Sequence, residues 1–287
     1  MSAAARWAVV SGVGGRLRSM CGRYAASRDP DDLVEEIEAA GLPVALAEAD
    51  RGALHPSFNV APTQQVATVL SPRADEGSEP GPARLRAMRW GLVPSWATDP
   101  KIGNRMINAR VETVAEKPAF RSLVASRRCL LPADGWFEWQ TVPAERSPAG
   151  KARKQPFFMS VPGGGLVALA GLYSWWRDPA VDDPDDPSAW LGTVTVLTTD
   201  AEPDLQAVHD RMPVVLPPER WSAWVSRDVA APEALAVVAT LPQGRFAAVP
   251  VQPAVGNVRN DSPALLARPD DADLVGVVDP STGALFG

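Results

Sequence analysis

The stretch RCLLPADGWFEW, residues 128–139, is the part of the sequence that decides the fold. Residues 129–132 and 135–139 are short apolar and aromatic runs, which is typical of β-strands. Because side chains alternate between the two faces of a strand, Glu138 shares a face with Trp136 and its immediate neighbours point the other way. The pattern therefore predicts a β-rich core in which a carboxylate lies among aromatic rings.

Comparable runs extend along the chain in both directions. Further strands are predicted at residues 66–70, 86–90, 157–161, 167–172 and 193–199, and helices at residues 31–40, 217–225 and 232–241. Polar or Pro/Gly-rich stretches separate them, notably at residues 71–82, 141–155 and 178–188. The 29 prolines disfavour a helical bundle and fit a loop-rich α+β fold.

The composition excludes several classes of protein. The hydrophobic fraction of 46% is enough for a substantial core. No run reaches the roughly 18 uninterrupted apolar residues of a membrane helix, so no membrane partner is expected. The two cysteines, Cys21 and Cys129, are far apart and form neither a disulfide framework nor a CxxC metal pair. We expect a cytoplasmic protein with no metal and no cofactor.

Charge is distributed unevenly along the chain. The net charge of -6 argues against a generally basic nucleic-acid binder. Residues 84–128, however, carry ten Lys or Arg and three acids, whereas residues 178–190 carry five aspartates and no base. One positive face could therefore attract a polyanion. Solvated surface arginines with no partner explain the charge equally well.

The two ends differ from the middle of the chain. Residues 1–19 are rich in Ala, Gly, Ser and Arg without clear periodicity. We interpret them as a mis-assigned start, with Met20 as the true first residue, or as a removed propeptide. Residues 20–268 are expected to form one domain, and the polar residues 269–287 a loosely held tail.

Few side chains offer acid–base chemistry. Of the two histidines, His55 lies before a proline and is interpreted as structural, whereas His209 is flanked by Asp210 and Arg211. An imidazole titrates near neutral pH and can transfer a proton there. Burial among aromatic rings should raise the pKa of Glu138, unless it lies on an edge strand and faces water.

The basic segment also contains residues suited to binding and orienting groups. Asn108 can donate and accept hydrogen bonds, and Arg110 can hold a phosphate, although a turn Asn and a surface Arg are ordinary alternatives. Trp90 and Trp96 are interleaved with arginines, which suits stacking on unpaired bases. Tryptophan is usually a core residue, and we expect that role for at least one of the two.

Cys21 has distinctive chemistry only if it becomes the N-terminal residue. It then carries a thiol and a primary amine on adjacent carbons. The pKa of an α-amine is near 7.7–8.0, against about 10.4 for lysine, so much more of it is uncharged at neutral pH. Such an amine attacks an aldehyde to give a Schiff base, and the thiol can close a five-membered thiazolidine. Cysteine is small enough for the preceding methionine to be removed.

Eight segments together resemble the SOS-response-associated peptidase family, which shields abasic sites. The resemblance covers roughly residues 20–268, and the order and number of the segments make it specific. The matching strings are MCGRY at 20–24, NVAPTQ at 59–64, MRWGLVPSW at 88–96, NARVET at 108–113, KPAFR at 117–121, RCLLPADGWFEW at 128–139, AGLY at 170–173 and HDRMP at 209–213.

The resemblance implies a single α+β domain with a mixed, barrel-like β core and peripheral helices. It implies that the mature N-terminal cysteine crosslinks to the sugar aldehyde of an abasic site in single-stranded DNA. The implied roles are the nucleophile for Cys21, its positioning for Asn108, proton transfer for Glu138 and His209, phosphate binding for Arg23, Arg110 and Arg211, and contact with flanking bases for Pro62 and Trp90.

One departure from the family pattern matters. Nineteen residues precede Met20, and while they remain attached the Cys21 nitrogen is an amide that cannot form a Schiff base. Self-cleavage after Met20, which the family name suggests, is a second route to a free amine. Two other functions remain open. One is a cysteine peptidase that uses Cys21, His209 and Glu138, and the other is a protein that binds single-stranded DNA without a covalent bond.

The protein is expected to be a monomer.

Overall fold

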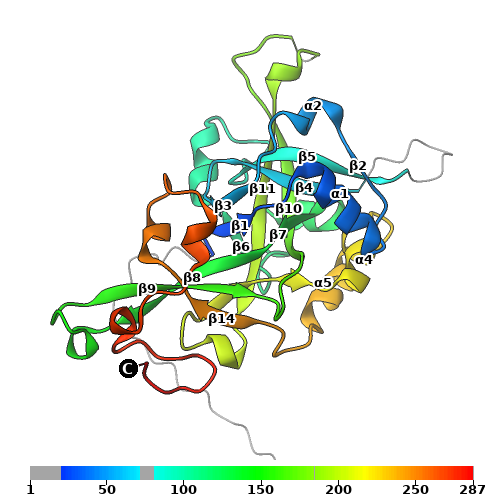
Figure 1. Ribbon diagram of the computed structural model, residues 1–287. Helices are drawn as coiled ribbons and strands as arrows, with labels where there is room; N and C mark the ends of the chain where they lie inside the picture. The colour runs from blue at the N-terminus through cyan, green and yellow to red at the C-terminus, as the bar shows by residue number, and fades with distance from the viewer. Residues whose placement is uncertain (1–20, 72–80, 184, 287) are drawn as a thin grey trace, which may run out of the picture.

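The fold is carried by two β-sheets that the computed structural model describes for residues 21–71, 81–183 and 185–286 (Figure 1). The smaller sheet has the order β14-β9-β8-β1-β3. Its strands are β1 (Tyr24–Ala26), β3 (Ser57–Val60), β8 (Gly135–Val142), β9 (Arg153–Ser160) and β14 (Ala247–Pro250). Strand β8 is therefore internal, and β1 links it to β3.

The larger sheet closes on itself. Its main path is β12-β11-β10-β7-β4-β5-β2, with β13 paired to β10 and β6 paired to β11. Parallel pairing of Val194 with Trp90 joins β11 to β5 and closes β11-β10-β7-β4-β5 into a ring. The strands are β2 (Val44–Leu46), β4 (Gln65–Leu70), β5 (Ala83–Trp90), β6 (Asn108–Arg110), β7 (Arg128–Ala133), β10 (Val167–Arg177), β11 (Trp190–Asp200), β12 (Arg211–Pro213) and β13 (Val215–Leu216).

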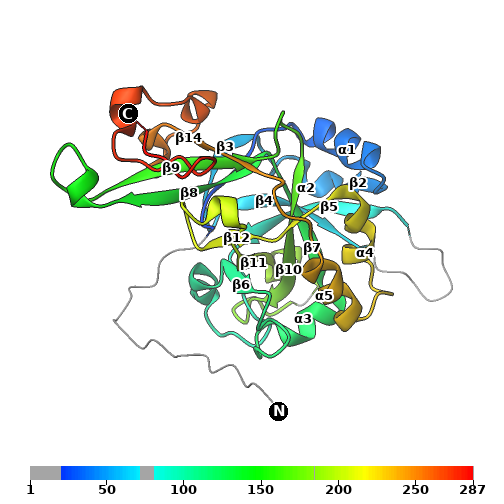
Figure 2. The same cartoon turned by 90° about the horizontal axis from the view of Figure 1, so that it is seen from below.

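Short helices pack against the larger sheet (Figure 2). They are α1 (Pro30–Ala39), α2 (Glu48–Arg51), α3 (Arg121–Ser126), α4 (Trp221–Val225) and α5 (Ala231–Ala239). Helix α1 begins where Asp29 accepts a hydrogen bond from the Asp31 N–H and Pro30 occupies the first turn. Leu33 and Ile37, one turn apart, bury its apolar face. The mixed, barrel-like α+β class with peripheral helices is thereby confirmed.

Two large apolar clusters fill the molecule. The first contains residues of both sheets, including Tyr24, Trp136 and Val194, and therefore holds the sheets together. The second joins residues of the ring strands, such as Leu172, to the inner faces of the helices, including Ile37 and Trp224. Since burial of large apolar side chains is the main stabilising term, these clusters fix how the strand ends are placed relative to one another.

The predicted elements correspond to β4, β5, β7, β8, β9, β10, β11, α1, α4 and α5, with shifted ends. Strand β8 continues to Val142 and β9 begins at Arg153, so the predicted loop at 141–155 is shorter than expected. The short strands β1, β6 and β12 were not predicted, because three-residue strands form through pairing with longer neighbours and carry little pattern of their own.

The chain's end differs from the loosely held tail that its polar composition suggested. Leu274 and Val277 are fully buried in the first apolar cluster. The Phe286 N–H donates to the Val277 carbonyl, and Val278 and Leu285 form a β-bridge. A few apolar residues are therefore enough to dock residues 271–286. The expected extra segment, residues 1–19, lies outside the described residues.

None of the helices in the described part of the chain combines the length and the apolar character that spanning a lipid bilayer requires.

Candidate active site around Cys21 and Glu138

Strand pairing brings Cys21 to Glu138. Strand β1 runs antiparallel to β8 with Tyr24 opposite Trp136, and the Phe137 N–H donates to the Arg23 carbonyl. Continuing this register places the residues just before β1 against Glu138. The Cys21 backbone N–H donates to Glu138 Oε1 at 2.7 Å, across 117 residues of sequence. The pair is thus fixed by the sheet.

Glu138 is a buried carboxyl. Only 2% of it is exposed, and the internal position of β8 excludes the alternative of an edge-strand glutamate facing water. Burial raises its pKa to about 7, although hydrogen bonds from Cys21 and the charge of Lys154 act in the opposite direction. The raised pKa that the sequence predicted is confirmed. Such a carboxyl can both accept and donate a proton near neutral pH.

The Cys21 thiol is held as a neutral group. Burial raises its pKa well above the usual value, and the nearby Glu138 carboxylate raises it further by charge repulsion and by accepting the thiol hydrogen bond. The backbone at Cys21 has a φ of 39°, in the left-handed region that side-chain-bearing residues seldom adopt. Backbone of this kind is concentrated at functional sites, where the surrounding structure holds it in place.

Asn108 reaches the same place from β6. This strand runs parallel to β11, with Asn108 opposite Val196. The Asn108 Nδ2 donates to the Cys21 carbonyl at 3.4 Å. Asn108 therefore contacts the main chain of Cys21, which fits a positioning role for this residue.

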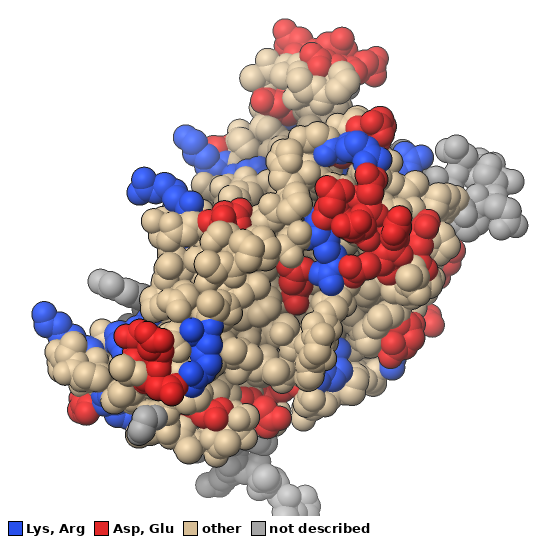
Figure 3. Space-filling model, in the orientation of Figure 1, with Lys and Arg blue, Asp and Glu red and all other residues tan. Residues whose placement is uncertain are grey.

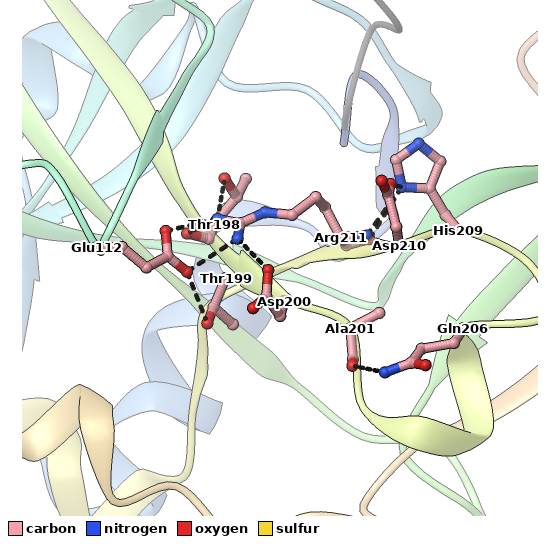
Figure 4. A network of polar contacts seen from close by, with 9 residues as sticks. All are labelled: Glu112, Thr198, Thr199, Asp200, Ala201, Gln206, His209, Asp210 and Arg211. Atoms are coloured by element: carbon pink, nitrogen blue, oxygen red, sulfur yellow. Dashed lines mark hydrogen bonds and ion pairs between the residues drawn. The ribbon is translucent and has the colours of Figure 1, made fainter. Parts of the chain in front are cut away.

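His209 lies in the loop that leads into β12, on the other side of the end of β11. Its Nδ1 is 3.1 Å from Asp210 Oδ1 and accepts from the Arg211 N–H at 3.1 Å (Figure 4). Asp210 is close enough to raise the pKa of both Cys21 and Glu138 through its charge. The His209 loop is thus adjacent to the buried pair. The four predicted catalytic residues come from four places in the chain: β6, β8, the residues just before β1 and the loop just before β12.

Arg211 does not have the phosphate-binding position that was predicted for it. Its side chain extends away from His209 and is 7% exposed (Figure 4). The guanidinium donates to both Glu112 oxygens at 2.9 Å, to Asp200 Oδ1 at 2.6 Å and to the Thr198 carbonyl at 2.8 Å. Because two carboxylates and a carbonyl already surround it, we assign Arg211 to the support of β12 and of the His209 loop.

Trp90 also differs from its predicted contact with bases. It is 1% exposed, its indole N–H donates to the Ile107 carbonyl, and its ring lies 5.2 Å from that of Tyr24. Trp90 is therefore a core residue that connects β5 to the segment preceding Asn108. Trp96, by contrast, is 64% exposed, so the expectation that at least one of the two is a core residue is met by Trp90.

The remaining DNA-binding candidates lie at different depths. Arg23 is half-buried, and its Nη1 donates to Asn59 Oδ1 and to the Val255 carbonyl, both at 2.7 Å. Its guanidinium also lies 5.9 Å from the Trp139 ring centroid. Pro62 is partly exposed and precedes Thr63, whose φ of 77° is unusual for a β-branched residue. Arg110 is exposed and follows Asn108 by two residues.

The basic segment is only partly available to a ligand. Arg86 pairs with Asp50, and Arg128 is buried against backbone carbonyls including those of Val124 and Trp224. The exposed basic residues of the segment are Arg84, Lys101, Arg105, Arg110, Lys117 and Arg121. The five aspartates of the 178–190 segment lie on the β10–β11 hairpin, which projects at the top of Figure 3 as an acidic knob.

Two residues that influence Glu138 were not predicted. Lys154 lies on β9 opposite Thr141, and its charge lowers the pKa of Glu138. Asp210 was noticed only as a neighbour of His209. No local signal could identify Lys154, because its proximity depends on the register between β8 and β9. Among the described residues no group of three or more His, Cys, Asp or Glu side chains is arranged to hold a metal ion.

Comparison with known proteins identifies relatives along most of the chain. The model of the SOS response associated peptidase (SRAP) family matches residues 20–258. The abasic site processing protein YoqW of Bacillus subtilis is 35% identical, over 86% of this chain and 99% of that protein. YedK of Escherichia coli is 32% identical over 86% and 99%, and HMCES of Xenopus tropicalis is 30% identical over 86% and 78%; both are named abasic site processing proteins.

Solved structures show the same architecture. A crystal structure of a Bacteroides thetaiotaomicron protein matches with a TM-score of 0.67, over 87% of this chain and all of that one, at 20% identity. A phage-related protein of Bordetella bronchiseptica matches with a TM-score of 0.57, over 81% and 94%, at 29% identity. From its sequence and its fold, the chain belongs to the SOS response associated peptidase family.

Proposed function

We propose that this protein processes abasic sites by forming a covalent thiazolidine crosslink between Cys21 and the sugar aldehyde of the lesion in single-stranded DNA. The observation that carries the proposal is the 2.7 Å contact between the Cys21 nitrogen and the buried Glu138 carboxyl. Once Cys21 is the N-terminal residue, the same contact joins a primary amine to a group that exchanges protons near neutral pH. The names of the relatives support the same substrate.

The chemistry balances with the groups at the site. The closed sugar opens when its C1′–O4′ bond breaks: O4′ takes a proton from His209, the C1′ hydroxyl returns its own proton to His209, and C1′ becomes an aldehyde carbon. Glu138 accepts a proton from the Cys21 ammonium, the amine lone pair attacks C1′, and a proton moves from the nitrogen to the former carbonyl oxygen. Glu138 then gives its proton to this hydroxyl, which leaves as water and gives a protonated imine. The thiol sulfur adds to the imine carbon, its proton passes to the Glu138 carboxylate, and the five-membered ring closes.

Binding of the strand is assigned to exposed groups near the site. Arg110 lies two residues beyond Asn108, at the end of β6, and can neutralise a phosphate. Farther along the same surface segment, Trp96 lines a groove of about 360 Å³ together with Lys101 and Arg105. An exposed indole that shares a groove with two cations, and with Asp99, suits stacking on an unpaired base of the bound strand. Arg23 and Pro62 remain proposed contacts.

The thiol argues against the rival function of a cysteine peptidase. A peptidase requires the thiolate, which forms where positive neighbours depress the cysteine pKa. Here burial and the Glu138 carboxylate raise the pKa of the Cys21 thiol instead. A neutral thiol is sufficient for thiazolidine closure, because the amine makes the first bond. The proposal requires cleavage before Cys21 only because this step frees the amine. An aminopeptidase or the chain itself would carry it out.

The test uses protein that begins at Cys21, verified by intact mass, and a single-stranded oligonucleotide with one abasic site. We expect an adduct that survives denaturing electrophoresis and whose mass is the sum of the partners minus one water. An oligonucleotide with a tetrahydrofuran analogue, which has no aldehyde, is the matched substrate control and should give none.

Two variants separate the possibilities. Cys21→Ser retains the amine and loses the thiol, so it should stop at an imine that reverses unless borohydride reduces it. A chain with an uncleaved residue before Cys21 should form no adduct. A Cys21→Ser protein whose adduct is as stable as that of the wild type would refute the thiazolidine. Binding that is lost in salt and under denaturation would instead indicate a non-covalent binder, and turnover of peptides in trans would indicate a peptidase.

A further inference from the structure

Gln140 shares a strand face with the acid–base carboxyl and has no role in the chemistry described above. It lies two residues after Glu138 on β8, so the two side chains project from the same face. Gln140 is 3% exposed. Polar side chains buried to this degree must find partners within the protein.

Its amide connects two segments that are far apart in sequence. Gln140 Nε2 donates to the Ala207 carbonyl and to the Val278 carbonyl, each at 3.0 Å. Gln140 Oε1 accepts from the Val278 N–H at 2.7 Å. One amide therefore satisfies both backbone groups of a residue in the C-terminal segment and one carbonyl of the loop that carries His209.

The C-terminal segment, residues 271–286, is itself fixed to the rest of the protein. Leu274 and Val277 are fully buried. Arg153, on the strand next to β8, donates to the carbonyls of Asp273 and Val275 at 2.6 and 3.1 Å. The segment thus presents Val278 to Gln140 from a fixed position.

The other end of the connection is a short, tight turn. The Val208 and His209 N–H groups both donate to the Leu205 carbonyl, at 2.9 and 3.2 Å, and Gln206 Nε2 donates to the Ala201 carbonyl at 3.2 Å (Figure 4). Ala207 is exposed and lies two residues before His209. Gln140 contacts the turn through the Ala207 carbonyl.

We propose that Gln140 is a positioning residue for His209. Its hydrogen bonds tie the 205–209 turn to the C-terminal segment, and this connection fixes the position of the imidazole relative to Glu138 and Cys21. The expected effect on the crosslinking rate rests on the proposed function, whereas the expected effect on the position of His209 does not. Without this amide, the Ala207 carbonyl and the backbone groups of Val278 lose a partner, and the turn loses its connection to the C-terminal segment.

The structural test uses the fact that the chain has only two histidines. Proton–carbon NMR of the imidazoles of Gln140→Leu should show shifted or exchange-broadened signals for His209 and unchanged signals for His55, which serves as an internal control. The matched variant is Gln155→Leu. Gln155 is also fully buried, and it donates to the carbonyls of Pro156 and Val251. Within the described residues its oxygen accepts only a long, 3.4 Å hydrogen bond from Arg153, and none of its hydrogen bonds joins it to the His209 turn.

The kinetic test measures the single-turnover rate of crosslinking with protein that begins at Cys21. At saturating DNA, Gln140→Leu should lose about 10- to 100-fold in rate, as expected for a displaced catalytic group, with little change in DNA affinity. Gln155→Leu should keep the wild-type rate. Val277→Ala, which loosens the C-terminal segment, should slow the reaction less, and adding it to Gln140→Leu should have no further effect.

The outcomes are distinguishable from failure of the proposed function. If wild-type protein forms no adduct, the proposed function fails, whereas the NMR comparison still decides the position of His209. Unchanged His209 signals in Gln140→Leu would overturn the positioning role, and so would equal rate losses in Gln140→Leu and Gln155→Leu. Full additivity of Val277→Ala and Gln140→Leu would overturn the part assigned to the C-terminal segment.

Discussion

Replacement of Glu138 by glutamine should change stability and reactivity in opposite directions. Burial raises the pKa of Glu138 from an ordinary 4.5 to about 7 in the folded chain. At low pH the carboxyl is neutral in both the folded and the unfolded states and has no effect on the pH dependence. As the pH rises from about 4.5 toward about 7, the unfolded carboxyl loses its proton while the folded one retains it, so the free energy of unfolding falls.

The size of this effect follows from the two pKa values. At about 1.36 kcal/mol per pKa unit, the buried carboxyl costs about 1 kcal/mol near pH 5 and about 3 kcal/mol near pH 8. Glutamine has nearly the same shape, can accept the Cys21 N–H and does not ionise. Glu138→Gln should therefore stabilise the protein progressively more as the pH rises, with a difference of about 2 kcal/mol across this range.

The assay is urea unfolding of the full chain near pH 5 and near pH 8, with Glu145→Gln as the control. Glu145 is an exposed glutamate at the far end of the β8–β9 hairpin and should show no such trend. In protein that begins at Cys21, Glu138→Gln should at the same time slow crosslinking by about 100-fold or more, the usual loss for a missing acid–base group. Parallel stability profiles of wild type and Glu138→Gln would refute the raised pKa, and an unchanged crosslinking rate would refute the role in proton transfer.

Three further predictions concern residues whose roles the structure separates. Arg211→Gln leaves Glu112 without its bidentate partner and should lower the free energy of unfolding by about 2–4 kcal/mol. The loss is smaller than for a fully buried pair because Glu112 is half exposed. A urea midpoint equal to that of the wild type would contradict this assignment. Trp96→Ala should weaken binding of single-stranded DNA by about 1–3 kcal/mol in fluorescence anisotropy, whereas Trp190→Ala, an exposed indole beside the acidic hairpin, should not. Arg110→Gln should reduce the slope of log affinity against log salt by about 0.7, and an identical slope would remove Arg110 from the DNA contact.

Much of the fold was accessible from sequence because it depends on local pattern. The strands that contain Leu131, Glu138 and Val196 are apolar or aromatic runs in the sequence, and the predicted helix at residues 31–40 corresponds to α1, which buries Leu33 and Ile37. The same alternation placed Glu138 beside Trp136, and burial of that face followed. The raised pKa of Glu138 could therefore be predicted before any contact was known.

Other residues could not be assigned in this way, because their roles depend on long-range pairing. Trp90 and Trp96 are alike in sequence context, yet one is in the core and the other is exposed. Arg211 was expected to face DNA, but the pairing of β12 with β11 directs it toward Glu112 and Asp200. No local signal distinguishes an arginine that meets a phosphate from one that meets a carboxylate.

The sequence by itself determined the class of fold, the family and the chemical groups at the site, since each of these depends on residue type and local order. Only the tertiary structure decided which of those groups meet. The register of β1 against β8 brings the Cys21 nitrogen to Glu138, and closure of the ring at β11 places β6 and β12 on either side. Hydrogen-bond register between distant strands arises from the packing of the whole core, and no single segment encodes it.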